Sequence, residues 1–450
     1  MTLNHERFGG QPSVDVFVNA YLKINGDAAQ QINNLYACTD GYGRTYGQLL
    51  NNCDQITASG DNMLSYRTEA MRWYFISLPF DLDVSRTALD ANGAQYAIRY
   101  YDGEGRAANG NSGNWKNVDR TGIIPAGTGF IYQTNVTTWT HFLAADTENK
   151  YGTLRTTEFN KTLEVNASDN ASNKGWNLVG NPYQCFYNNH SLNFTAPITV
   201  WNGSTYVAYS LTDDDYAIRP NEAFFVQCPN EEYNTIGFPI QGRQLTSVID
   251  NQNAGARALA SAGQARQVVN LSISNGESED QTRVVLNEEA SEAYEMMCDA
   301  SKFMSMDNSV PQIYTLDNAG TMYAINERPI KEGSVDLGVY AGQTGDYTIS
   351  VTRCDAGQVF ITDNQTGKTS EITNSAYAFS AKAGADNSRF TLSFVPDDVT
   401  AVSEIEKTES AGKVEVYSID GKFLGTDASH LNSGLYIIRQ GKNVRKLVVR

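Results

Sequence analysis

Two stretches of the sequence decide the fold: RWYFISLPFD at Arg72–Asp81 and GWNLVGNPYQCF at Gly175–Phe186. In each, a Trp leads a run of apolar residues, and a Pro followed by an aromatic residue stands six positions after it. A Trp-led apolar run predicts a buried strand, which the proline ends or places at an edge. The two stretches therefore predict the same strand in two copies of one unit.

Two further pairs of segments match in the same order. IRYYDG at Ile98–Gly103 corresponds to ITVWNG at Ile198–Gly203, and IIPAGTGFIY at Ile123–Tyr132 corresponds to AIRPNEAFFV at Ala217–Val226. Their Asp-Gly and Asn-Gly steps supply the positive φ that tight hairpin turns need. Three matched blocks, spaced by about 95 to 103 residues, indicate a tandem duplication.

The duplication organises the first half of the chain. We expect an N-terminal β-containing flank at 1–72, a first β repeat at 73–160 and a second at 161–250. In the flank, the alternation of Val14–Ile24 predicts a strand, and Gln48–Ile56 predicts a short helix. The Gly- and Asn-rich segment Asp102–Arg120 predicts a loop without a core.

The second half of the chain also predicts β structure. Residues 251–266 are rich in Ala, Gly and Asn and predict a linker. From 267 to 396, short alternating runs recur at about ten-residue spacing, which is typical of an antiparallel β-sandwich. A second linker at 397–412 leads to a small β module at 413–450. The predicted fold class is therefore all-β: tandem duplicated β domains, an antiparallel β-sandwich and a small C-terminal β module.

The net charge of the chain disfavours some classes of binding partner. The 450 residues carry a net charge of −17, which disfavours nucleic acid and anionic membrane surfaces. The sequence contains no run of 18 apolar residues, so it predicts no transmembrane segment. Residues 413–450 carry +4 and the remainder −21, which marks the C-terminus as a separate module. The scarcity of Lys and Arg is common in exported β-proteins, and we expect a leader that is absent from this numbering.

The C-terminal segment VEVYSIDGKFLG…HLNSGLYIIRQGKNVRKLVVR resembles the sorting domain of proteins exported by the type IX (Por) secretion system of Bacteroidetes. The residues that carry the resemblance are Tyr417, Asp420, Gly421, Gly434 and Tyr436. The preceding sandwich and the GWNLVGNPY pattern are similar to domains of such surface proteins. The resemblance implies a secreted or outer-membrane surface-attached protein, with the secretion machinery as a partner.

One feature departs from the family pattern. Longer sorting domains carry a Pro-Asn-Pro-containing strand upstream, and the connector at 397–412 has none. The tail therefore resembles the short variant. The alternative is a small hairpin and strand that docks on the sandwich and has no role in sorting.

Catalytic motifs are missing. The sequence lacks HExxH, GxxxxGK[ST], GxGxxG and GxSxG, and its four histidines are far apart. The sequence also lacks CxxC and the Cys/His spacings of zinc sites, so no zinc site is predicted. Among 51 acidic residues a pair of carboxylates could always be chosen, so none is singled out. We therefore expect a protein that is not an enzyme.

Two polar groups of residues are candidates for sites. Asp213, Asp214 and Asp215 form the densest acidic cluster and predict a calcium site, with a solvated turn as the alternative; calcium is the one cofactor expected. The six cysteines fall two by two into the predicted segments. They suggest the disulfides Cys38–Cys53, Cys185–Cys228 and Cys298–Cys354, with buried unpaired thiols as the alternative.

Aromatic residues are the other candidates. Trp115, Trp139 and Tyr206 lie on or beside Asn- and Gly-rich loops, where their rings could stack on a sugar. Trp73, Trp176 and Trp201 belong to the matched blocks, and we expect them in the cores of the two copies.

These observations support three functions. The first is a non-enzymatic secreted or cell-surface protein, adhesive or structural, with a glycan or host matrix protein as its partner. The alternatives are a carbohydrate-binding surface protein for glycan capture and a polysaccharide-degrading enzyme with an unrecognised site. A row of exposed rings favours the second, and two facing carboxylates in a cleft favour the third.

Overall fold

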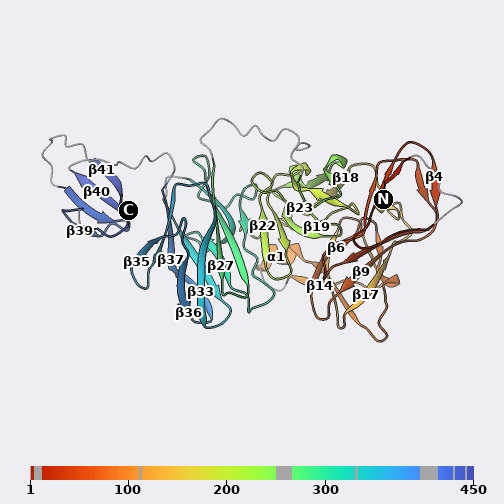
Figure 1. The fold of residues 1–450 in the computed structure, drawn as a ribbon, viewed down its shortest axis with the longest axis horizontal. Helices are drawn as coiled ribbons and strands as arrows, with labels where there is room; N and C mark the ends of the chain where they lie inside the picture. Colours follow the sequence, from red (N-terminus) through yellow and green to blue (C-terminus); the bar gives the residue numbers. More distant parts are fainter. Residues whose placement is uncertain are drawn as a thin grey trace. The chain divides into compact units, whose positions relative to one another are not determined.

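A computed structural model describes residues 2–4, 13–110, 114–249, 266–329, 333–395, 414–428, 431–440 and 443–449 (Figure 1). The predicted all-β class is confirmed, because strands dominate every region and α1 (Gly103–Asn109) is the one α-helix in the described ranges. The chain forms two compact units, Met1–Ala262 with Tyr294–Ala300 and Gly263–Ala293 with Ser301–Arg450. Most of both predicted linkers lies outside the described residues.

The duplication appears as two sheets of identical strand order. In the first copy the order is β10 (Tyr74–Ser77), β16 (Gly129–Thr134), β13 (Tyr96–Tyr101), β14 (Trp115–Asn117). In the second it is β19 (Trp176–Gly180), β24 (Ala223–Gln227), β21 (Ile198–Trp201), β22 (Tyr206–Tyr209). Each sheet therefore begins with the Trp-led strand that the sequence matched.

Outer strand pairs complete both copies. In the first copy they are β11 (Leu82–Asp83) with β15 (Ile123–Ile124), and β9 (Asn62–Thr68) with β17 (Thr138–Leu143). In the second they are β20 (Phe186–Asn188) with β23 (Ala217–Ile218), and β18 (Phe159–Thr162) with β25 (Thr235–Phe238). Each copy encloses its own apolar core, which its Pro-aromatic step and central strands supply.

The two copies pack against each other through their first strands. The Ser77 amide donates to the Asn221 carbonyl at 3.1 Å, and the Gly180 amide donates to the Gly127 carbonyl at 3.0 Å. A Cβ at Gly180 would lie 2.2 Å from the Ser77 Cβ, so a residue larger than glycine would push the copies apart. The close approach brings the ends of both Trp-led strands into one region.

The N-terminal flank winds as a short parallel coil. Strand β2 (Val14–Val16) pairs with β5 (Leu35–Asp40), β3 (Tyr21–Asn25) with β7 (Gln48–Asn51), and β4 (Gln30–Ile32) with β8 (Ile56–Ala58), all in parallel. Strand β5 continues in parallel onto β9 and so joins the coil to the first copy. The helix predicted at Gln48–Ile56 is wrong, because its apolar residues fill the inside of this coil from strands.

Helix α1 lies in the segment Asp102–Arg120, which we expected to be a loop. Asp102 caps it by accepting the Gly105 amide at 3.0 Å. The helix carries the fully buried side chain of Arg106. The expectation failed because two buried residues, Gly103 and Arg106, anchor a helix whose other residues are small or polar.

The second unit contains one eleven-stranded sheet that curves around a single core. Its order is β35 (Lys368–Glu371), β34 (Gln358–Asp363), β37 (Gly384–Val395), β32 (Ser334–Ala341), β30 (Gln312–Leu316), β31 (Met322–Arg328), β28 (Glu279–Leu286), β27 (Gln267–Ser274), β33 (Gly345–Cys354), β36 (Tyr377–Ala381), with β29 (Ala300–Ser301) on β31. The sheet is antiparallel except at β28–β31, which pair in parallel.

The C-terminal module is a four-stranded sheet of order β39 (Phe423–Gly425), β38 (Val414–Ser418), β40 (Gly434–Gln440), β41 (Asn443–Val449). Tyr417 lies on β38, Gly434 begins β40, and Asp420-Gly421 forms the turn between β38 and β39. Gly421 has a φ of 82°, which favours glycine. No described helix has the length and apolar content needed to cross a membrane.

Candidate functional site

A cavity opens where the two copies meet the turn between β5 and β6 (Thr45–Tyr46), and we call it the junction cavity. Its volume is about 70 Å³. Its lining comes from four parts of the first unit: the segment 41–46, Tyr66 of β9, the start of the first Trp-led strand, and the β21–β22 and β23–β24 turns of the second copy. The residues that matter most for its chemistry are Arg44, Arg72, Trp73, Trp201, Arg219 and Glu222.

Aromatic rings form one wall of the junction cavity. Trp73 and Trp201 are both half-buried and both line it, whereas we expected them in the cores of the copies. Phe75 packs beneath Trp201, with 5.9 Å between ring centroids. The Trp201 Nε1 atom is buried and makes no hydrogen bond to any described residue. A water or a ligand acceptor would satisfy this buried donor.

Two arginines meet at the opposite rim. A Cβ built on Gly203, in the β21–β22 turn, would lie 2.6 Å from Arg72 Nη2 and 3.1 Å from Arg44 Nη2. Arg72 Nη2 donates to the Gly203 carbonyl at 3.3 Å. Glycine at this position, with a φ of 102°, therefore lets both guanidinium groups approach the turn.

The third arginine is neutralised within the site. Arg219 Nη1 lies 2.6 Å from Glu222 Oε1, and the Glu222 carboxylate raises the pKa of Arg219. Tyr216 donates its hydroxyl to the same carboxylate at 2.8 Å. Because Glu222 is 8% exposed, this network holds the β23–β24 turn rigidly and leaves Arg219 without excess charge.

Strained backbone surrounds the cavity. Five described non-glycine residues have positive φ, and three of them, Arg44 (51°), Met71 (60°) and Asn221 (61°), line the cavity or precede a lining residue. Asn tolerates this conformation, but for Arg and Met it costs about 1–2 kcal/mol each. Such strain accumulates at functional sites when the surrounding structure holds it in place.

The duplication creates a counterpart of this cavity that is sealed. Trp176 corresponds to Trp73, and Tyr101 corresponds to Trp201. In the counterpart, the Arg106 guanidinium lies over the Trp176 ring at 5.0 Å and 3.4 Å from the Tyr101 hydroxyl. The connection that carries Arg106 runs over 102–114, whereas the matching β21–β22 turn covers only 202–205. The longer connection closes one copy, and the short turn leaves the other open.

Two of the aromatic residues expected to face a ligand are engaged in packing. Tyr206 is 4% exposed and lies against Trp201 and Phe75. Trp115 is half-buried and contacts Phe75 and Tyr101. Each ring begins the second strand of its hairpin, and β14 and β22 turn both rings into the contact between the copies. Ligand binding by either residue stays a prediction.

Trp139 lies elsewhere, on the outward face of β17, where it pairs with Arg67 of β9 and is half-buried. It is not among the residues that line the junction cavity. Its role in ligand binding stays a prediction.

The same outward face holds a Ser-His-Asp hydrogen-bond chain that the sequence did not indicate. The Ser65 hydroxyl lies 2.9 Å from His141 Nδ1, and His141 Nε2 lies 2.7 Å from Asp90 Oδ1. Ser65 stands in the middle of β9 and is 8% exposed. A nucleophile needs an exposed position such as a sharp turn, so we interpret this chain as a cross-strand contact.

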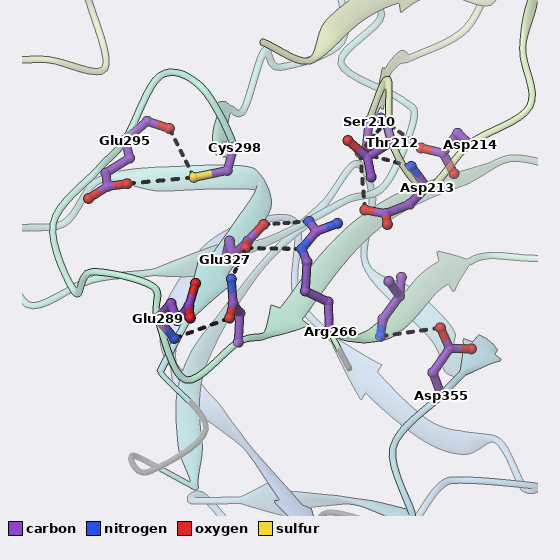
Figure 2. A network of polar contacts seen from close by, with 12 residues as sticks. Ser210, Thr212, Asp213, Asp214, Arg266, Glu289, Glu295, Cys298, Glu327 and Asp355 are labelled. Atoms are coloured by element: carbon purple, nitrogen blue, oxygen red, sulfur yellow. Dashed lines mark hydrogen bonds and ion pairs between the residues drawn. The ribbon is translucent and has the colours of Figure 1, made fainter. Parts of the chain in front are cut away.

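The three carboxylates of the acidic cluster have different hydrogen-bond partners. Asp213 Oδ2 accepts the Ser210 hydroxyl at 3.0 Å, and Asp214 Oδ2 accepts the Ser210 amide at 2.7 Å (Figure 2). Asp215 Oδ1 lies 2.7 Å from His190 Nε2. No three His, Cys, Asp or Glu side chains in the described ranges gather as metal ligands. These consecutive carboxylates turn to separate partners in and around the loop, and calcium binding by them stays a prediction.

No disulfide joins any of the six cysteines, all of which the structure describes. The structure shows none of the predicted pairs Cys38–Cys53, Cys185–Cys228 and Cys298–Cys354, and their formation stays a prediction. Burial raises the pKa of Cys185 to about 12 and that of Cys228 to about 11. Both thiols, like Cys53, fill apolar cores as small hydrophobic side chains, which matches the alternative interpretation.

Comparison with known proteins adds one match. Residues 184–394 match the model of a domain of unknown function, DUF8693. The matched range contains Trp201, Gly203 and the Arg219–Glu222 turn, but not Arg44, Arg72 or Trp73. No curated protein and no solved structure matches the chain.

Proposed function

We propose that this chain is a non-enzymatic, secreted or surface-attached adhesive protein that binds a saccharide in the junction cavity. The observation that carries the proposal is the pair of half-buried rings, Trp73 and Trp201, in a cavity with a buried indole donor that has no described acceptor. Aromatic faces pack on the apolar faces of sugar rings, and a fixed N–H donor selects a hydroxyl.

Other features support this function over its alternatives. The Glu222 carboxylate, the one acid in the lining, accepts hydrogen bonds from Tyr216 and Arg219 and has no second carboxylate facing it across the cavity. Hydrolysis of a glycosidic bond generally uses two carboxylates, so the lining favours binding. Backbone of positive φ at Arg44 and Met71 lies at or next to the cavity, as is common at binding sites.

The C-terminal module completes the proposal. Its four-stranded sheet carries the residues on which the resemblance to sorting domains rests, with Asp420-Gly421 in the turn after β38 and Gly434 at the start of β40. We assign it to export. In the producing cell, a chain ending at residue 395 should fail to reach the surface, whereas equal export of the truncated chain would remove this part of the proposal.

Binding of the full chain to a glycan array, with and without EDTA, tests the main proposal. We expect saturable binding that EDTA does not change. Trp73→Ala and Trp201→Phe should each weaken it, because the first removes a ring and the second removes the buried donor while keeping the packing. Trp139→Ala is the matched control and should bind normally. Loss of binding in Trp139→Ala alone would move the site to the outward face of β17.

A further inference from the structure

The lining of the junction cavity carries positive charge, although the protein as a whole is acidic. Its lining includes three arginines and one glutamate, whereas the chain as a whole carries −17. Glu222 neutralises Arg219, so the excess positive charge belongs to Arg44 and Arg72.

These two guanidinium groups lie close together and have little compensation. Their Nη2 atoms approach one point, the Cβ position of Gly203, and are therefore no more than roughly 6 Å apart. Arg72 has a partly exposed ion pair with Glu69 at 3.4 Å. Arg44 makes no hydrogen bond or ion pair with the described residues. Two like charges at this separation repel each other, and an anion between them would relieve the repulsion.

The fold holds Arg44 in this position. Asp40 Oδ1 accepts the amides of Tyr42 and Gly43 at 3.1 and 2.9 Å and so fixes the β5–β6 turn that Arg44 ends. Asp40 is itself paired with Arg67 at 3.0 Å. The guanidinium is thus presented by an ordered turn, which is the preorganisation that a binding site needs.

The sealed counterpart has no such pair. Gly175 stands where the first copy has Arg72, and Arg106 occupies the space between the rings. The pair of arginines therefore belongs to the open copy alone. Because Arg44 comes from the flank outside the duplicated blocks, it is an addition to the repeat rather than a remnant of it.

We propose that the junction cavity selects saccharides that carry an acidic group, a carboxylate or a sulfate, and that Arg44 and Arg72 bind this group while the sugar ring lies against Trp73 and Trp201. This inference rests on the proposed saccharide-binding function and adds the charge of the ligand. Guanidinium groups bind oxyanions through paired, charge-assisted hydrogen bonds. The neighbouring rings then bind the apolar face of the same sugar.

Titration calorimetry of the full chain tests the inference with three probes: a glucuronic-acid-containing disaccharide, a glucose 6-sulfate-containing disaccharide and the matching neutral glucose disaccharide. We expect at least one acidic probe to bind about tenfold or more tightly than the neutral one, and the preferred probe identifies the anion. Added salt should reduce this difference, because it screens the arginines.

Two variants assign the difference to the arginines. Arg44→Asn keeps a residue that tolerates positive φ, and Arg72→Gln keeps most of the side-chain length. Each should remove most of the preference for the acidic probe over the neutral one. Arg86→Gln, a partly exposed arginine paired with Asp61 outside the cavity, is the control.

The outcomes separate the two proposals. Equal affinity for acidic and neutral probes, or a preference that survives both arginine variants, would overturn the inference and leave saccharide binding intact. Absence of binding to all three probes and to the glycan array would overturn the proposed function as well.

Discussion

Replacing Lys302 by Met should destabilise the second unit strongly. Lys302 Nζ lies 2.5 Å from Asp280 Oδ2, and both side chains are 0% exposed. The same carboxylate accepts the Ile313 amide at 2.8 Å. Removing the cation leaves a buried carboxylate without this counter-charge, and breaking such a pair costs about 3–5 kcal/mol. Since the Ile313 bond remains, we expect the lower end, about 3 kcal/mol.

Calorimetry of the full chain measures this loss. For a unit of this size, about 3 kcal/mol lowers the Tm by about 6–12 °C. All five tryptophans lie between Trp73 and Trp201, in the first unit, so tryptophan fluorescence follows that unit alone. The fluorescence transition should stay in place while the calorimetric transition of the second unit moves.

Two further variants make the result decisive. Arg353→Ala removes an exposed ion pair to Asp355, with both side chains 38% exposed, and should cost less than about 1 kcal/mol. Adding Asp280→Asn to Lys302→Met removes the stranded charge and should restore at least half of the stability. The reasoning is refuted if Lys302→Met shifts the transition no more than Arg353→Ala does.

Two other predictions follow from pKa shifts. Burial opposes the ionisation of Asp363, but hydrogen bonds from Arg389 and Tyr377 hold its pKa below the usual range. The contribution of ionised Asp363 to folding stability is therefore complete above about pH 4 and is lost as the pH falls further. Between pH 4 and 2 the wild type should lose stability more steeply than Asp363→Asn. Acid unfolding curves of the two proteins measure this difference. Because burial raises the pKa of Cys185 and Cys228, neither should be alkylated at pH 8 in the native chain. After unfolding without reductant, all six cysteines should be alkylated, and a smaller mass gain would reveal a disulfide.

The sequence predicted those parts of the fold that depend on local patterns. Trp73 and Trp176 marked the paired strands because a Trp-led run and a Pro-aromatic step recur at fixed offsets. The parallel coil of the flank was missed because its strands have only three to six residues, too few to show a period. Its register depends on pairing between residues some 20 positions apart, such as Val14 and Leu35.

The junction cavity was out of reach for a different reason. Its arginines, Arg44 and Arg72, meet at Gly203, and nothing in the sequence around any of the three indicates that meeting. One signal was available: the connection after Tyr101 is much longer than the one after Trp201. Matched repeats that differ in a single loop differ at the surface that the loop covers, so the comparison points to the open end of the second copy.

That difference also explains why a duplicated protein has a single candidate site. In both copies the same two elements come together: a Trp-led strand, β10 or β19, and a hairpin, β13–β14 or β21–β22, that carries an aromatic residue. In the first copy, Arg106 occupies the space over Trp176 and donates to the Ser172 carbonyl at 3.2 Å, so that end contributes stability and no binding surface. In the second, the four-residue turn leaves Trp73 and Trp201 accessible, and the flank supplies Arg44 across the gap. After duplication, the same arrangement of a Trp-led strand and an aromatic hairpin thus serves packing in one copy and, as we propose, recognition in the other.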